Sequence, residues 1–411
     1  MNLLRSSAIR ATIIAPTLLL ATVAAHATDG YFQHGFGARQ KALGGAGVAD
    51  GRDATTTSLN PAGLVHSGNE VSAAVSWFNP HRGFDAPASV GSIDSLQEDF
   101  FVPNFAASYR LIPGSIVDVV GVTVYGNGGL NTNYAGNFFG GAGKSGVDLQ
   151  QALVSFGAAK QFGALSVGIA PTLLRQRFKA RGLQAFGLDP NPDNDVAWGA
   201  GVRGGVEWQV APAIRLAVAG SSKIYSQKFD GYEGLFAEGG DFDIPPSLQA
   251  GIAVDITSRL TALVDYKRIW FGSVASIANP STNPFPLGSD NGPGFGWQDI
   301  DVIKVGLEWR ATDALTLRAG YSYATSALQA RDVFFNILAP AAVQHHITGG
   351  FEYAVNDNWS VELAGLYAPE GSISGVSPLG PTELRMHQYD VTVGVKYKFG
   401  QPSERSPAAL K

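Results

Sequence analysis

The segment Gly140-Gly-Ala-Gly-Lys-Ser145 has the residue types of a nucleotide-binding loop. A P-loop requires a further glycine five residues before its Gly-Lys pair, where this chain has Phe138, and no helical pattern follows Ser145. One alternative is a loop in which Phe138 and Phe139 make the first contact with an apolar ligand. The other is a flexible loop with an incidental aromatic pair.

Two other polar segments have the composition of metal sites but not the spacing. Asp189-Pro-Asn-Pro-Asp-Asn-Asp195 lacks the glycine of a calcium loop, and Ala200 stands where the bidentate glutamate belongs. His345 and His346 are adjacent in a predicted strand, so their side chains point to opposite faces. No Ser, His and Asp constellation of a hydrolase is recognisable. We expect that the protein binds no metal and no cofactor and is not an enzyme.

Composition limits the elements that could position a ligand. The 411-residue chain has no cysteine, 15% charged residues, 10% aromatic residues and a net charge of −5, which gives no basic surface for nucleic acid. Arg5 and Arg10, the apolar residues 11–23 and Ala25-His26-Ala27 have the order of a secretory signal peptide, so we expect a leader at 1–27. No later apolar run reaches about 18 residues, so no transmembrane helix is expected.

From residue 70 onward, segments alternate between apolar side chains and polar or small ones. The last of them, Tyr389–Phe399, also has aromatic residues at both ends of its apolar face, as at membrane interfaces. Short and long linkers alternate strictly between the segments. Fourteen segments are found: 69–79, 100–111, 116–126, 148–161, 164–179, 196–209, 213–229, 245–256, 259–273, 299–310, 314–326, 342–355, 358–369 and 387–399.

This rhythm is typical of an outer-membrane barrel with short periplasmic turns and long extracellular loops. We expect an all-β fold: a 14-stranded antiparallel transmembrane β-barrel over 67–399, with a C-terminal tail at 400–411. The protein would then be a monomeric, multi-pass component of a Gram-negative outer membrane, in contact with its lipid and lipopolysaccharide.

Strand parity separates lipid-facing from lumenal side chains. It places Lys267 in the lumen below Trp270, where it could bind a ligand carboxylate or form a salt bridge with Asp265 or another wall residue. Parity also predicts that Arg175, Arg177 and Lys179 face outward, where they could meet lipopolysaccharide phosphates. A bulge at Pro171 would instead turn these three side chains inward, toward a ligand carboxylate. The other lumenal charges are predicted at Arg203, Glu207, Arg215, Asp255, Asp265, Lys304, Glu308, Arg318, Glu352 and Glu362.

Residues 28–66, called the hatch below, do not alternate. They are rich in glycine and contain the turn Asn60-Pro61-Ala62-Gly63, which would stop a helix or a strand. With an even strand count, this segment enters the barrel from the periplasmic side, and we expect it to plug the lumen. Its candidate gate residues are Gly30, Phe32, Gly44, Gly45, Gly47, Asn60, Pro61 and Ala62.

The hatch sequence GYFQHGFGARQKALGGAGVA, followed by DATTTSLNPAGL, resembles the FadL/TodX-type transporters of long-chain fatty acids and hydrocarbons. The resemblance continues in 260–271, 297–326 and 387–399 and so covers essentially the whole expected mature chain. It implies a 14-stranded monomeric barrel with an N-terminal hatch, passive uptake of hydrophobic molecules, and a kink in the third strand that opens a lateral exit. The chain departs from the family at Ala341–His346 and in its tail.

The third predicted strand is apolar on both faces, which fits a lateral route. Val120, Val122 and Val124 are the candidate ligand contacts and Gly121 the candidate bend. The alternative is an ordinary strand packed against the hatch. We therefore expect uptake of hydrophobic compounds such as long-chain fatty acids, with an aromatic-hydrocarbon channel, a general porin or a surface adhesin as alternatives.

Overall fold

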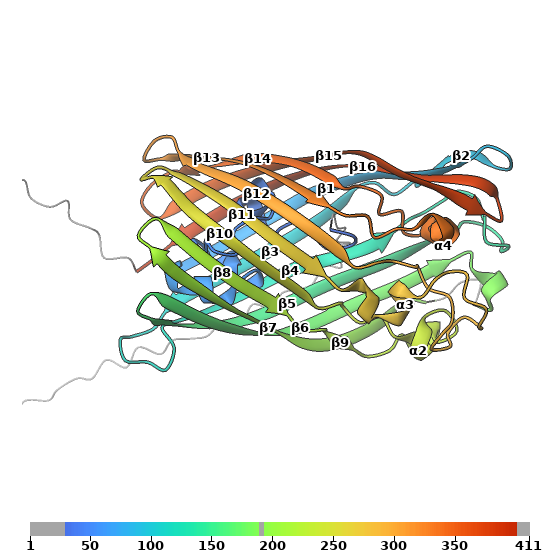
Figure 1. Ribbon diagram of the computed structural model, residues 1–411, viewed down its shortest axis with the longest axis horizontal. Coiled ribbons are helices and arrows are strands. Elements are labelled where there is room, and N and C mark those ends of the chain that lie inside the picture. Colours follow the sequence, from blue (N-terminus) through green and yellow to red (C-terminus); the bar gives the residue numbers. More distant parts are fainter. Residues whose placement is uncertain (1–28, 189–192, 401–411) are drawn as a thin grey trace, which may run out of the picture.

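The computed structural model describes residues 29–188 and 193–400. One antiparallel sheet closes on itself through pairing of β16 with β1 and forms a barrel of 14 long strands (Figure 1). The expected signal peptide lies outside the described residues, as do the tail from residue 401 onward and residues 189–192 of the calcium-like segment.

The long strands follow the predicted segments. They are β1 (Glu70–Ala86), β3 (Phe100–Arg110), β4 (Val119–Asn131), β5 (Gly146–Phe162), β6 (Leu165–Arg181), β7 (Asp195–Ala211), β8 (Ile214–Ser221), β10 (Ser247–Thr257), β11 (Leu260–Ile269), β12 (Ile300–Arg310), β13 (Leu315–Ala324), β14 (His345–Ala354), β15 (Trp359–Ser377) and β16 (Gly380–Lys398). Two short strands extend the sheet, β2 (Gly91–Asp94) on β1 and β9 (Tyr225–Ser226) on β7.

The interval 370–386, between the last two predicted segments, was expected to be a long loop, and this expectation is wrong. β15 and β16 continue through it as a paired hairpin that turns between Ser377 and Gly380. This segment is rich in glycine and serine, a composition typical of loops. Backbone hydrogen bonds between two neighbouring strands hold the hairpin without needing a strongly apolar face.

Alternation of burial along the strands confirms the predicted parity. On β7, Trp198 and Trp208 point outward, 53% and 52% exposed, and the outward residues between them are apolar or small. This arrangement suits a lipid-facing band bounded by aromatic belts. His346 is buried and His345 exposed, as their opposite faces predict. No helix in the described part of the chain is long and apolar enough to cross a membrane.

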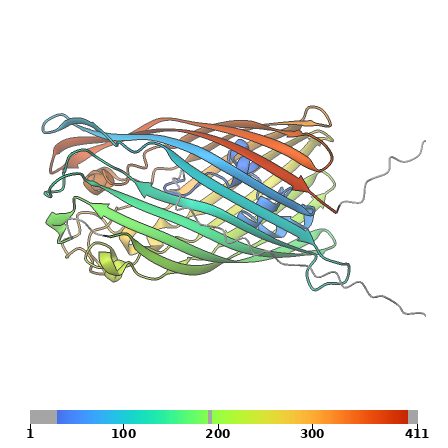
Figure 2. The ribbon, with the colours of Figure 1, turned by 180° about the vertical axis from the view of Figure 1, so that it is seen from behind.

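The hatch fills the barrel interior on the side of the short turns (Figures 1 and 2). It consists of α1 (Gly37–Ala42), η1 (Ala54–Ser58) and η2 (Pro61–His66), joined by buried turns. Helix α1 packs on β13 to β16, and η2 packs on β5, β6 and β7. Gly45 has a φ of +74°, and a Cβ there would lie 2.0 Å from the His34 carbonyl oxygen, so only glycine fits.

The Asn60-Pro61-Ala62 turn begins the last helix of the hatch. Asn60 Oδ1 accepts a hydrogen bond from the Ala62 amide at 3.0 Å and so caps η2, with Pro61 at its first position. The Asn60 amide nitrogen donates to the Val48 carbonyl at 2.8 Å and joins this helix to the middle of the hatch. The sequence signature therefore has a structural role within the plug.

Short helices form the extracellular loops at the end opposite the short turns. They are η3 (Gln184–Phe186), η4 (Asp230–Tyr232), α2 (Ala237–Gly240), η5 (Phe271–Ser273), α3 (Ala275–Ala278), η6 (Ala330–Asp332) and α4 (Val333–Asn336). Aromatic and aliphatic side chains from these loops belong to one large buried cluster that covers the extracellular end of the barrel.

Candidate functional site

An apolar pocket lies between the extracellular loops. It is partly open to solvent, with about 470 Å³ of empty space, and Phe139, Phe178, Phe236, Phe295, Phe335 and Leu338 are among its lining residues. Phe139 is 3% exposed, and its ring centroid lies 5.0 Å from that of Phe334. A pocket with almost entirely apolar walls recognises a ligand through burial of apolar surface rather than through hydrogen bonds.

Phe138 lies beside this pocket rather than in its lining. Its ring packs edge-to-face on Phe84 at 5.1 Å and near Tyr134 at 6.0 Å between ring centroids. The structure thus places both phenylalanines of the glycine-flanked segment at the cluster that covers the extracellular end. Of the two, only Phe139 borders the pocket.

Another part of the same buried cluster lies at the start of the hatch. Tyr31 stacks on Phe32 at 4.9 Å between ring centroids and lies 5.5 Å from Phe271 and 5.9 Å from Trp297. Gly30, with a φ of +70°, allows this packing, since a Cβ there would lie 2.6 Å from the Phe271 ring. The hatch therefore contributes its own aromatic side chains to the buried apolar cluster.

Lys267 and Lys304 converge on the first described residue of the hatch. Their Nζ atoms lie 3.1 Å and 3.0 Å from Asp29 Oδ2. The Lys267 ammonium also lies 5.4 Å from the centroid of the Phe32 ring. Burial alone would raise the pKa of Asp29, but the two lysines outweigh it and hold that pKa well below its usual range. Lys267 faces the lumen as parity predicts, and its partner is a hatch carboxylate rather than Asp265.

The next part of the hatch is fixed to the wall by Asp265. Its Oδ2 accepts hydrogen bonds from the backbone amides of Gly47 and Val48, at 2.8 and 2.9 Å. Gly44 lies against the wall at Tyr321, whose backbone nitrogen would be 2.9 Å from a Cβ on Gly44. The glycines here allow close backbone approach between plug and barrel.

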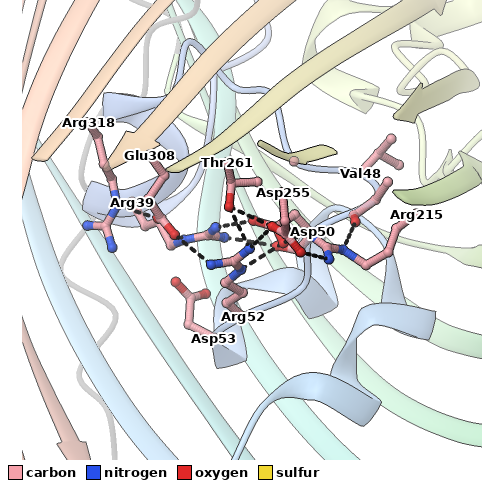
Figure 3. A network of polar contacts seen from close by, with 12 residues as sticks. Arg39, Val48, Asp50, Arg52, Asp53, Arg215, Asp255, Thr261, Glu308 and Arg318 are labelled. Carbon is pink, nitrogen blue, oxygen red and sulfur yellow. Dashed lines mark hydrogen bonds and ion pairs between the residues drawn. The ribbon is translucent and has the colours of Figure 1, made fainter. Parts of the chain in front are cut away.

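An ionic network, buried except at the partly exposed Arg52 and Asp255, fixes the periplasmic half of the hatch (Figure 3). Asp50 contacts Arg39 at 2.6 Å, Arg52 at 2.8 Å and the wall residue Arg215 at 2.9 Å. Further ion pairs join Arg39 to Glu308, Arg52 to Asp255 and Glu308 to Arg318. Removing one partner of a buried ion pair costs about 3–5 kcal/mol, so this half of the plug is held strongly.

The wall pairing is incomplete between β3 and β4. These strands pair only from Arg110↔Val119 to Asn104↔Tyr125, although β4 continues to Asn131. Beyond this point the hatch takes the place of β3: the Gln33 amide donates to the Asn127 carbonyl at 2.7 Å, and the Gly129 amide donates to the Tyr31 carbonyl at 3.2 Å.

The same strand corrects two expectations. Its register with β5 is regular at Gly121 and shifts between Gly126 and Gly128, so the irregularity lies at Asn127. Gly121 instead faces the hatch, where a Cβ would lie 2.8 Å from Thr57 Oγ1. Val120, Val122 and Val124 alternate with these inward positions and face outward rather than into the lumen. Both faces of a Val-rich strand are apolar, so composition alone could not assign its lumenal side.

The family comparison decides the class of protein. Residues 20–374 match the family model described as "Outer membrane protein transport protein (OMPP1/FadL/TodX)". The chain belongs to this family. Members are transport channels of the outer membrane, and the FadL/TodX assignment places this chain among multi-pass outer-membrane proteins that transport hydrophobic compounds.

Solved structures confirm the fold. The chain is similar to the Pseudomonas putida toluene transporter TodX, with 18% identity, a TM-score of 0.67 and coverage of 90% of this chain and 100% of the other. The Ralstonia pickettii toluene transporter TbuX has 20% identity and a TM-score of 0.64, and the match covers 89% of this chain and 99% of the other. A Pseudomonas aeruginosa FadL homologue has 14% identity and a TM-score of 0.67, and the match covers 90% of this chain and 100% of the other. A comparison with curated proteins found no significant match.

Sequence reasoning missed three parts of this FadL/TodX-family site. Trp297 and Phe271 both lie in the loop between β11 and β12, although the predicted segment 259–273 included Phe271, and nothing in the sequence distinguishes Tyr31 from its neighbours. Asp29 carried no signal as the partner of Lys267, because contacts between a plug and a wall are not encoded in local spacing. In the described residues, no three or more potential metal ligands are arranged to hold an ion.

Proposed function

We propose that this protein mediates passive uptake of hydrophobic compounds across the outer membrane. The observation that carries the proposal is the incomplete β3–β4 pairing, where hatch residues Tyr31–Gln33 replace a wall strand. Detachment of this short segment would uncover an opening in the barrel side. The proposed route starts at the Phe139 pocket, passes the Tyr31 cluster and ends laterally at β4, without covalent chemistry or an energy source.

A route through the periplasmic floor is disfavoured by its charge. The hatch side chains Arg39, Asp50 and Arg52 lie there in the ionic network. An apolar solute would have to separate these buried pairs, and it would offer no compensating polar contacts. Movement is therefore assigned to the start of the hatch, while α1, η1 and η2 stay in place.

The preferred substrate class is the long-chain fatty acids. When Asp29 leaves together with the start of the hatch, Lys267 would remain as a cation beside an apolar site and could receive a ligand carboxylate. Phe138 and Phe139 are proposed to make the first contact with the ligand.

The proposed organisation of the chain has a leader at 1–27 that is removed, the hatch at 28–66, the barrel at 67–399 and a tail at 400–411. We propose that the protein is a monomer surrounded by outer-membrane lipid and lipopolysaccharide.

Aromatic hydrocarbons are the second candidate. Tyr31, Phe271 and Trp297 pack together on the proposed route, and their ring faces and edges would suit a monoaromatic solute without any charge if the start of the hatch moved. TodX and TbuX are toluene transporters, which supports the same class for this chain. A general porin is disfavoured because the hatch fills the lumen, and an adhesin would not require an apolar cluster inside the barrel.

Uptake of labelled oleate and labelled toluene separates these candidates. Cells lacking the chromosomal gene are complemented with wild type, with Lys267→Met or with an empty vector. A fatty-acid channel predicts oleate uptake that depends on Lys267, whereas a hydrocarbon channel predicts toluene uptake that does not. If neither compound enters faster with wild type than with the vector, the transport proposal fails.

A further inference from the structure

Four basic residues form a column on the outer face of β6, defined here as Arg175, Arg177, Lys179 and Arg181. They alternate with the buried residues Gln176, Phe178 and Ala180. The register with β5 is the same on both sides of Pro171, from Ser155↔Thr172 to Ala158↔Ile169, so no bulge reverses the strand. The outward interpretation of these side chains is confirmed.

The height of the column is fixed by its neighbours. Leu165 pairs with Trp208 of the periplasmic belt, and Arg175 pairs with Trp198 of the extracellular belt. Between Leu165 and Arg175, the outward residues of β6 are Val167, Ile169, Pro171 and Leu173. Leu165 to Leu173 spans about 26 Å along the strand, or about 20 Å along the membrane normal at a tilt of about 40°. The column therefore begins where the apolar band ends, at the headgroups of the outer leaflet.

The charge of the column is largely unmatched. Asp148 contacts Arg177 at 3.0 Å, and the Arg175 guanidinium lies 6.0 Å from the Trp198 ring centroid. Among the residues that the structure describes, Arg175, Lys179 and Arg181 have no ion-pair partner. Four cations against one carboxylate leave three positive charges unmatched in a chain whose net charge is −5.

Other outward arginines at the extracellular end are balanced within the protein. Arg268 on β11 contacts Asp299 and Asp301, and Arg385 on β16 contacts Asp85 and Asp94. The β6 column differs from these sites because its counter-charge is missing from the described chain. A row of largely unmatched cations at the level of the outer headgroups would be neutralised by an anionic lipid.

We propose that the β6 column binds the phosphates of the outer-leaflet glycolipid, the lipid A part of lipopolysaccharide. Arginine forms paired hydrogen bonds with phosphate oxygens, and Arg175 and Arg177 are the cations nearest the end of the apolar band. The acyl chains would lie on the apolar face formed by Ile169, Pro171 and Leu173. The proposal depends only on the barrel orientation and stands whether or not the chain transports fatty acids or hydrocarbons.

Native mass spectrometry of the detergent-purified full chain tests this proposal with diphosphoryl lipid A, monophosphoryl lipid A and phosphatidylglycerol as probes. The double variant Arg175→Gln/Arg177→Gln, which removes the two cations nearest the apolar band, is compared with Arg385→Gln, which removes an already balanced arginine on another wall. We expect the double variant to bind diphosphoryl lipid A at least fivefold more weakly and Arg385→Gln to stay within twofold of wild type. Heat-modifiable migration on gels verifies that each variant is folded.

Three results would overturn the proposal. They are unchanged binding by the double variant, an equal loss in Arg385→Gln, and equal binding of phosphatidylglycerol and lipid A by wild type. If the double variant does not fold, wild type alone gives the decision: weaker binding of monophosphoryl than of diphosphoryl lipid A supports recognition of the phosphates, and equal binding refutes it.

Discussion

Lys267 on the barrel wall and Asp29 at the start of the hatch form a buried ion pair, with Nζ and Oδ2 3.1 Å apart. The pair lies beside the aromatic rings at the start of the hatch and close to the break between β3 and β4. It joins the part of the plug that covers this break to a wall residue able to bind an anion. The ion pair and the segment proposed to move are thus located together.

Asp29→Asn should loosen the start of the hatch. The change leaves Lys267 and Lys304 without their shared carboxylate, and breaking such a buried pair costs about 3–5 kcal/mol locally. We expect faster amide hydrogen exchange at residues 29–36 and higher single-channel conductance, with the ionic network around Asp50 unchanged. Asp313→Asn removes an exposed partner of Arg259 and serves as control. Equal exchange in both variants would refute a gating role for Asp29.

Gly45→Ala should destabilise the hatch. The added Cβ would meet the His34 carbonyl oxygen at 2.0 Å in a backbone conformation that favours glycine, which predicts a loss of about 2 kcal/mol or more. Gly365→Ala is a matched control, because a Cβ there would have no neighbour within 4 Å. Protease cleavage within the hatch should increase for the first variant only. Resistance equal to that of wild type would show that the hatch backbone adapts.

The barrel was predictable from sequence because strand parity recurs in fourteen segments and short and long linkers alternate between them. A residue such as Trp309, 49% exposed on the lipid face, follows from its place in an alternating segment. The aromatic packing at the start of the hatch was less predictable. Tyr31 comes together with Phe271 and Trp297 only when the hatch and the β11–β12 loop fold into one barrel, and nothing in the local spacing of these residues predicts this.

The third strand shows the same limit in detail. Gly121 suggested a bend, but its missing side chain makes room for Thr57 of the hatch. The register shift occurs at Asn127, where the hatch backbone supplies the hydrogen-bond partners. A partner that comes from a segment about a hundred residues earlier leaves no mark in the pattern of the strand itself.

Phe139→Ala should weaken capture of apolar ligands. Phe139 borders the extracellular pocket, and removing a buried ring loses about 2–3 kcal/mol of apolar contact. We expect uptake of the preferred substrate to fall at low concentration and to recover at saturating concentration. Phe285→Ala is the control, since Phe285 is 54% exposed in a neighbouring loop. Equal loss in both variants would indicate a general effect of aromatic loop residues.

The extracellular loop between β9 and β10 should respond to pH through Asp241. Burial, followed by the nearby Asp243, raises the pKa of Asp241 to about 7. A carboxyl whose pKa is raised in the folded state stabilises that state below its unfolded pKa of about 4, and this contribution is lost as the pH rises through about 7. We therefore expect hydrogen exchange at 227–246, corrected for the intrinsic pH dependence of amide exchange, to quicken between pH 5 and pH 8.

Asp241→Asn should remove this response, because the amide stays neutral at every pH in the range. The same substitution at Asp290, an exposed carboxylate in another extracellular loop, should leave the response intact. Lys223 lies 3.2 Å from Asp243 and limits the repulsion between the two carboxylates, so Lys223→Met should raise the midpoint of the transition. A corrected profile that is flat in wild type, or one that survives in Asp241→Asn, would assign the titration to a different group.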